Sequence, residues 1–366
     1  MVAERTDLAS WIKTLLLNLL AIPSETGSEG PILAYLEREL AEFGLPMARQ
    51  PVAGDRYNLL LNPLPEPALL IDVHVDTVPI VLDGAGCALR EEGNLVYGRG
   101  ACDAKGSIAA VLGALRLANP ASSSGFPVTV AFTVDEEEAG LGSEVLAEAI
   151  RPRGVLALEP TGLALCPVQA GSLVVRLRAF GKAAHGSEFD AGQNACSRLL
   201  GALSRLPSLP FLKASHPLLG ASGYNLRYLR GGSPELIVPR TGEAVVDFRL
   251  LPGMDLEAVQ QEVARLWASE GLEGEIIEVA PPYALRGDEA VIEMVRSAFR
   301  KSQGVEPRIA GMKSWTDAEN FHAAGVPAVI WGPGELAVAH TPEEHIDIGE
   351  IVRAAQVLAT LLQEVE

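Results

Sequence analysis

Short, nearly uninterrupted runs of apolar residues alternate with helical patterns through the first half of the chain. The runs cover residues 68–75, 127–134 and 155–158, and each has the length of a strand buried on both faces. A helical pattern lies between the first two runs, at residues 107–118. Because strands that alternate with helices form parallel sheets, this order predicts an α/β domain with a mostly parallel sheet between layers of helices.

The pattern changes near residue 169. Residues 171–180 alternate apolar side chains with arginines, as a half-exposed strand does. The following hundred residues predict a helix, two strands, a second helix and a last strand, which is an α+β arrangement.

Patterns typical of an α/β domain return from residue 283, with a buried strand at 326–331 and a closing helix at 348–362. The chain of 366 residues also exceeds the usual size of a single hydrophobic core. We therefore expect one large domain, interrupted by an inserted smaller one. The expected boundaries are residues 1–168 with 281–366 for the large domain, and residues 169–280 for the insertion.

Composition and charge narrow the classes of partner. Apolar residues make up 48% of the chain and charged residues 21%, as in ordinary globular proteins. The formal net charge of -18 disfavours nucleic acids and anionic membranes, whose own charge would repel the protein. No apolar stretch is long enough to span a membrane, and the N-terminus lacks a signal-peptide pattern. The four cysteines form no CxxC pair, so we expect a reducing, cytoplasmic location.

Two motifs in the first half combine polar side chains with tight turns. His74 and Asp76 follow the run 68–75, where alternation puts them on the same side at the carboxyl end of a strand. Alone, such a pair is more often structural than a metal site. Asp103 lies in a glycine-rich turn that leads into a helix, but its lysine precedes the glycine, unlike the order in a phosphate-binding loop. The glycines instead permit tight backbone geometry around the aspartate.

Further carboxylates and a histidine occupy similar positions. Residues 135–138 are four consecutive acids directly after a buried strand, and Glu159 follows the next strand. Clustered carboxylates repel one another and call for a cation. His340 lies after another predicted strand and turn. This mixture of imidazole and carboxylate suits zinc. Five protein ligands are more than one tetrahedral ion can bind, so we expect two ions that share a carboxylate. One glutamate is then left to act as a base.

These motifs, taken together, resemble the family of two-zinc deacylases and carboxypeptidases that includes acetylornithine deacetylase, acetyl-lysine deacetylase and succinyl-diaminopimelate desuccinylase. The similarity runs in order along nearly the whole chain. It covers His-Val-Asp-Thr-Val-Pro at 74–79, Gly-Arg-Gly-Ala-Cys-Asp-Ala-Lys-Gly at 98–106, Asp-Glu-Glu at 135–137, Gly-Lys-Ala-Ala-His at 181–185 and His-Thr-Pro at 340–342. The resemblance implies a zinc-peptidase-like catalytic domain and a ferredoxin-like lid that also forms a dimer.

The resemblance also implies a role for each ligand. His74 and Glu159 would hold one zinc, Glu137 and His340 the other, and Asp103 would bridge them. Cobalt is a possible substitute for zinc.

Five more residues take roles by the same resemblance. Asp76 would orient His74. Glu136 would act as general base, taking a proton from the water shared by the metals and passing it to the leaving nitrogen. His185, in the insertion, would stabilise the oxyanion, in a homodimer that forms through this domain. Arg249 would bind the carboxylate of the substrate. Many relatives have an asparagine where this chain has Leu236, and Asn225 or a main-chain group is the expected substitute.

The resulting hypothesis is a cytoplasmic, zinc-dependent hydrolase that removes an N-acyl group from an amino acid such as acetylornithine or acetyl-lysine. A desuccinylase and a dipeptidase or carboxypeptidase of the same family remain alternatives. A more distant alternative is a non-catalytic binding protein on the same scaffold. That alternative predicts the loss of a ligand or of Glu136, and the chain retains all of them.

Overall fold

The computed structural model describes residues 2–82, 85–119 and 126–365. Its internal contacts divide the chain into two compact units. The first consists of Met1–Pro167, Leu285–Ala310 and Thr316–Glu366, and the second of Val168–Ala284 and Gly311–Trp315. The domain boundaries expected from the sequence, 1–168 with 281–366 and 169–280, stay a prediction.

The first unit is built around a six-stranded sheet with the order β1-β2-β8-β3-β9-β18. The four strands from β8 to β18 are parallel, whereas β2 and β1 add an antiparallel edge. The mostly parallel sheet expected from the sequence is therefore confirmed. The strands are β1 (Met47–Ala53), β2 (Arg56–Leu61), β3 (Leu69–His74), β8 (Val128–Thr133), β9 (Val155–Leu158) and β18 (Ala328–Trp331).

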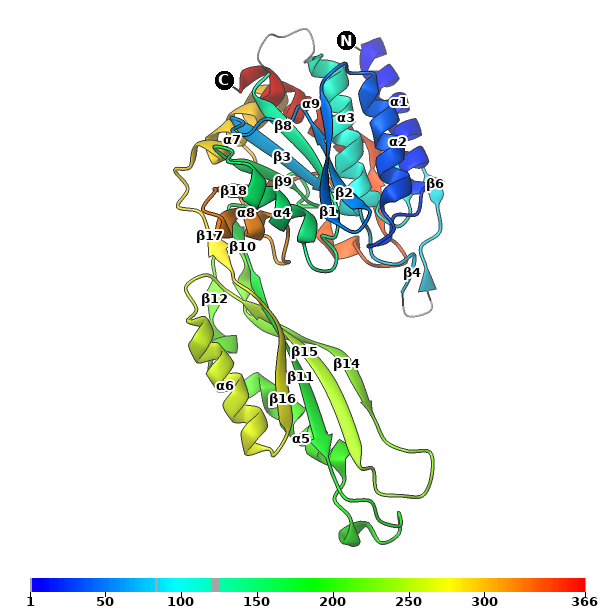
Figure 1. Cartoon of the computed structure of the whole chain (residues 1–366), viewed down its shortest axis with the longest axis vertical. Helices are drawn as coiled ribbons and strands as arrows, with labels where there is room; N and C mark the ends of the chain where they lie inside the picture. The colour runs from blue at the N-terminus through cyan, green and yellow to red at the C-terminus, as the bar shows by residue number, and fades with distance from the viewer. Residues whose placement is uncertain (1, 83–84, 120–125, 366) are drawn as a thin grey trace. The chain divides into compact units, whose positions relative to one another are not determined.

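Helices cover this sheet on both faces (Figure 1). One group, in which α3 contacts both α1 and α9, buries most of its apolar side chains. A second group consists of α4 and α8, which contact each other and the strands β1, β9 and β18. The helices are α1 (Val2–Leu20), α2 (Gly30–Ala41), α3 (Gly106–Ala118), α4 (Leu141–Ala149), α7 (Ala290–Gln303), α8 (Ala318–Ala323) and α9 (Ile348–Glu364).

The sequence explains why the central strands and the last helix form. Every residue of β3, β8 and β9 is buried, as in a sheet that helices cover on both faces. In α9, Ile348, Ile351, Ala355 and Leu358 recur at helical spacing and are all buried. The carboxylate of Asp347 accepts a hydrogen bond from the backbone N–H of Glu350 at 3.0 Å and so caps the first turn of α9.

Short elements complete the loops around the carboxyl ends of the strands. The π-helical turn η1 (Ala101–Lys105) leads directly into α3. Strand β7 pairs with β6 on one side and with β19 on the other. The remaining small elements of this unit are β4 (Val81–Leu82), β5 (Ala85–Gly86), β6 (Arg90–Glu92), β7 (Leu95–Tyr97), η6 (Leu336–Val338) and β19 (His345–Asp347).

The second unit is a four-stranded antiparallel sheet with the order β14-β15-β11-β16. Along the chain, this unit consists of a strand, a helix, two strands, a second helix and a last strand. This succession and the order of the strands in the sheet are those of a ferredoxin-like fold. Helices α5 and α6 bury their apolar faces in a core that is separate from that of the first unit. The elements are β11 (Gly171–Phe180), α5 (Ala195–Arg205), β14 (Gly223–Gly231), β15 (Thr241–Leu250), α6 (Leu256–Ser269) and β16 (Glu273–Ala280), with short pieces at β10 (Val168–Gln169), η3 (Phe189–Ala191), η4 (Leu206–Ser208), η5 (Pro210–Lys213), β12 (Ser215–His216), β13 (Gly220–Ala221) and β17 (Tyr283–Ala284).

Within the described ranges, none of the helices has both the length and the apolar character needed to cross a membrane. All four cysteines are free thiols.

Candidate metal centre

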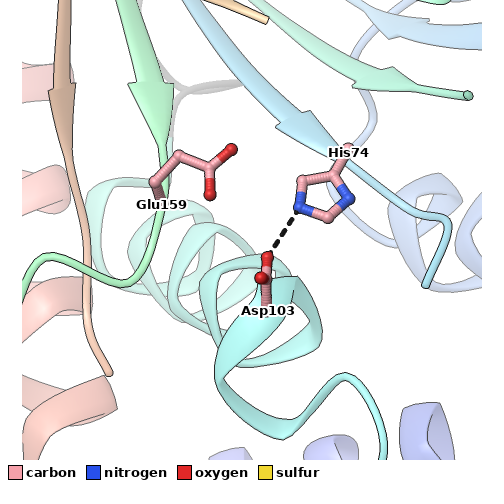
Figure 2. Close-up of side chains that lie close together, drawn as sticks. All are labelled: His74, Asp103 and Glu159. Carbon is pink, nitrogen blue, oxygen red and sulfur yellow. Dashed lines mark hydrogen bonds and ion pairs between the residues drawn. The ribbon is translucent and has the colours of Figure 1, made fainter. Parts of the chain in front are cut away.

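Three of the expected ligands converge at the carboxyl ends of parallel strands. His74 is the last residue of β3 and Glu159 directly follows β9, while Asp103 lies on the turn before α3. Figure 2 shows their side chains directed toward one another. One ligand atom from each lies within 4.8 Å of the other two, and all three residues are buried. The contact between His74 Nε2 and Asp103 Oδ1 measures 3.1 Å.

A second group of three forms around the other oxygen of Asp103. His340 Nε2 lies 3.5 Å from Asp103 Oδ2 and 3.1 Å from Glu137 Oε2. The ligand atoms of this group also lie within 4.8 Å of one another. Asp103 therefore belongs to both groups, with Oδ1 toward His74 and Oδ2 toward His340. A carboxylate with this placement is suited to bridge two cations.

The carboxylate of Asp76 organises the residues between the two groups. Its Oδ1 lies 3.5 Å from His74 Nδ1 and accepts the backbone N–H of Glu136 at 3.2 Å. Its Oδ2 accepts the backbone N–H of Glu137 at 3.1 Å and the hydroxyl of Thr26 at 2.8 Å. Burial opposes ionisation of Asp76, but the contacts with His74 and these donors outweigh it, and its pKa is lowered.

The charges in this region do not balance without a cation. Burial, followed by the charge of Asp103, raises the pKa of Glu159 well above its ordinary value. Burial and the charge of Glu159 do the same for Glu136. Burial opposes protonation of His340, yet the hydrogen bonds to Asp103 and Glu137 raise its pKa to about 10. Because buried carboxylates repel one another, one or more cations would relieve this strain, and the nitrogen and oxygen donors suit zinc.

Glu136 is buried beside both groups but supplies an atom to neither. It lies in the turn after β8, where Asp135 has a φ of 75° and its carbonyl accepts the backbone N–H of Gly140 at 2.7 Å. Consecutive residues of this turn therefore differ in position: Glu137 belongs to the group around His340, whereas Glu136 belongs to neither group.

The other three expected site residues lie in the second unit. His185 Nδ1 contacts the hydroxyl of Ser187 at 2.7 Å. Arg249, on β15, donates to the carboxylate of Asp247 at 2.7 Å. Asn225, on β14, is opposite Asp247 in the register of the two strands, and Leu236 is exposed. Arg249 thus contacts the Asp247 carboxylate, and Asn225 is paired with the same residue across the two strands.

Sequence reasoning missed several polar residues that support the ligands. The hydroxyl of Thr133, at the end of β8, lies 3.0 Å from Asp72 Oδ1 and 3.1 Å from Asp317 Oδ2, and Asp72 is two residues before His74 on β3. Burial raises the pKa of Asp317 to about 7. Arg56 contacts Asp135 at 2.6 Å and also pairs with the buried Glu29. An aspartate inside a run of buried strand residues was the one sequence signal for this network.

Histidine and carboxylate ligands around one shared aspartate, at the strand ends of an α/β sheet, define a candidate dinuclear metallohydrolase. The comparisons with known proteins agree with this class. The model of Peptidase family M20/M25/M40 matches residues 70–364 of the chain. The chain therefore belongs to this family, and it is a hydrolase that acts on amide bonds.

Relatives of similar length carry two kinds of name. The chain is 28% identical to a probable carboxypeptidase of Aspergillus clavatus, over 95% of this chain and 87% of the relative. It is also 28% identical to an acetylornithine deacetylase of Myxococcus xanthus, over 90% of each protein.

Solved structures share the fold along nearly the whole chain. An M20 family metallo-carboxypeptidase of Sulfolobus solfataricus superposes with a TM-score of 0.78 at 21% identity, over 96% of this chain and 98% of the other. The YXEP protein of Bacillus subtilis, described as a dinuclear metal binding peptidase, gives a TM-score of 0.66 at 15% identity, over 98% of each chain.

Proposed function

We propose that the protein is a zinc-dependent deacylase that hydrolyses the amide bond of an N-acylated amino acid, of the acetylornithine or acetyl-lysine type. The observation that carries this proposal is the position of Asp103, whose two oxygens face two separate ligand groups. The name of the Myxococcus xanthus relative supports the substrate class.

When bound, two zinc ions would acidify water and polarise the amide carbonyl. His74 and Glu159 would hold one ion, Glu137 and His340 the other, and Asp103 both. Cobalt would be expected to replace zinc, because the donors are the same nitrogen and oxygen atoms.

Glu136 is the proposed general base. Its carboxylate would take a proton from the attacking water and pass it to the leaving nitrogen. Burial, followed by the charge of Glu159, raises the pKa of Glu136 above its ordinary value, which favours a carboxyl group that can both accept and donate a proton. Asp76 would keep the imidazole of His74 in the required orientation and would fix the backbone of Glu136.

Three residues of the second unit would act on the substrate. Arg249 would bind the substrate carboxylate through its guanidinium, with Asn225 supplying an amide contact. His185 would donate a hydrogen bond to the developing oxyanion. We propose a homodimer through this unit, supported by the exposed edge strand β14 with Tyr224, Tyr228 and Leu229 on its surface. The free cysteines support a reducing, cytoplasmic location.

A panel of substrates tests the proposal. Purified, zinc-loaded protein would be incubated with N-acetylornithine, N-acetyl-lysine, N-succinyl-diaminopimelate and dipeptides, and the release of acetate, succinate or free amino acid would be measured. We expect acetate from the N-acetylated basic amino acids. Hydrolysis of dipeptides alone would favour the alternative that the Aspergillus clavatus relative suggests, a carboxypeptidase or dipeptidase. No hydrolysis of any of them by the zinc-loaded protein would contradict the proposal.

A further inference from the structure

A buried ion pair lies beside the shared aspartate but belongs to neither ligand group. Arg99 Nη1 and Glu344 Oε2 are 2.5 Å apart, and their side chains are only 4% and 0% exposed. Arg99 precedes the turn η1, and Glu344 lies four residues after His340 in the sequence. The function proposed above assigns no role to either residue.

The pair contacts three chain segments that carry metal ligands. Glu344 Oε1 accepts the backbone N–H groups of Cys102 at 3.3 Å and of Asp103 at 3.4 Å. Arg99 Nε donates to the carbonyl of Pro79 at 3.0 Å, in the segment that follows His74 and Asp76.

The third segment is reached through the backbone of Glu344, whose N–H donates to the carbonyl of Thr341 at 3.3 Å. Thr341 directly follows His340. One ion pair therefore links the segments of His74, Asp103 and His340, which are far apart in the sequence.

The energetics of burial argue that this arrangement serves more than stability. A buried ion pair contributes little net stability compared with apolar residues of the same volume, because both charges lose their hydration. Glu344 also adds a carboxylate next to a region already rich in negative charge. Burial and the charge of Asp103 raise its pKa, whereas Arg99 lowers it. The geometric effect is specific. Arg99 fixes the carboxylate of Glu344, and this carboxylate accepts the backbone N–H groups of Cys102 and Asp103.

We propose that Arg99 and Glu344 are positioning residues that hold Asp103 where its two oxygens can bind two cations. The proposal rests on the dinuclear centre of the proposed function. Neither residue is expected to bind metal, and each acts through the backbone of the segments it contacts.

Zinc affinity of the whole protein is the readout that separates positioning from simple stability. The variants are Glu344→Gln, which removes the charge with little change of shape, and Arg99→Lys, which keeps the charge but loses the planar fork. The control is Leu36→Ala, which shortens a fully buried apolar side chain on α2, a helix that carries none of the proposed ligands. Zinc affinity and stoichiometry would be measured by competition with a chromogenic chelator, and thermal unfolding would be measured without metal.

We expect Glu344→Gln to bind zinc about 10- to 100-fold more weakly than the parent, as is usual when the partner of a metal ligand is lost. Arg99→Lys should show a smaller loss of affinity. Leu36→Ala should unfold at a lower temperature but keep the parental affinity.

Parental zinc affinity in Glu344→Gln would overturn the proposal. Failure of both pair variants to fold even at saturating zinc would do so as well, because the pair would then be a requirement of the fold. Failure of this inference can be distinguished from failure of the proposed function. A protein that binds two zinc ions but hydrolyses no amide would refute the proposed function and leave this inference standing.

Discussion

At the scale of single residues, the site depends on side chains that serve two purposes at once. Asp76 contacts the imidazole of His74 and also accepts the backbone N–H groups of Glu136 and Glu137. Asp103 divides its two oxygens between two histidines. Each of these two carboxylates therefore contacts several partners of the candidate site at once.

Glu136→Gln separates proton transfer from metal binding. The amide has nearly the same shape as the carboxylate but cannot accept a proton, so we expect turnover to fall by roughly 10²-fold or more. Zinc stoichiometry should stay at the parental value, because Glu136 belongs to neither ligand group. Steady-state kinetics and metal analysis of the same preparation check both parts, and a variant as fast as the parent would remove the role of base.

Zinc binding should release protons. Burial opposes protonation of His340, but its hydrogen bonds to Asp103 and Glu137 raise its pKa from the ordinary value of 6.5 to about 10, so this imidazole is protonated in the metal-free protein at pH 7. Only the neutral imidazole coordinates a metal. Affinity should therefore rise as the pH increases from 6.5 toward 10. Calorimetric titrations in buffers of different ionisation enthalpy measure the release, and identical heats in all buffers would contradict it.

At the scale of elements, the strands place the ligands and the turns orient them. His74 and Glu159 come from the ends of neighbouring parallel strands, where Asp72 of β3 is paired in register with Ala157 of β9. The apolar runs predicted these strands, because burial on both faces leaves a clear pattern. Apolar residues at helical spacing predicted α9.

The antiparallel edge of the sheet could not be predicted in the same way. Strand β1 has the sequence Met-Ala-Arg-Gln-Pro-Val-Ala and alternates between exposed and half-buried positions. Because apolar and polar residues do not alternate regularly in this sequence, it does not show the pattern by which a strand is predicted. Similarly, the contacts of Asp317 with Thr133 and of Glu344 with Asp103 join residues more than 180 positions apart, and a single sequence gives no sign of them.

Gly142→Ala tests the packing of the turn that carries Glu136. A Cβ at Gly142, in the first turn of α4, would collide with the carbonyl of Val134 and lie 2.6 Å from Asn58 Oδ1. We expect a loss of roughly 1–3 kcal/mol in the free energy of unfolding, measured by denaturant titration. Gly201→Ala is the control: it lies in α5 with open space around it, and it should stabilise slightly. Equal stability of the Gly142 variant and the parent would show that the turn is free to move.

At the scale of the whole molecule, the chain forms two units with separate cores, and the proposed site residues are divided between them. The ligands and Glu136 all lie in the first unit, whereas His185, Arg249 and Asn225 lie in the second. The order of motifs along the chain pointed to five side chains that the structure brings together in two groups, and their role as metal ligands stays a prediction. Substrate recognition restricts residue type less than metal ligation does, as Leu236 illustrates, so the exact substrate did not follow from the sequence.

Removing metal should destabilise the first unit, because the buried carboxylates of Asp103, Glu137 and Glu159 would then repel one another. A ligand that binds only the folded state at a thousandfold excess over its Kd stabilises by on the order of 4 kcal/mol. We therefore expect a chelator to lower the unfolding temperature by several degrees and added zinc to restore it. The variant Asp103→Ala, which lacks the shared ligand, should respond little to zinc; a full response there would argue that zinc binds elsewhere.

Anomalous X-ray diffraction from crystals of the zinc-loaded protein, recorded on both sides of the zinc absorption edge, tests the dinuclear centre most directly. The account predicts two peaks about 3.5–4 Å apart, with Asp103 between them. One ion should contact His74 and Glu159, and the other Glu137 and His340. A single peak, or peaks away from these five side chains, would contradict it.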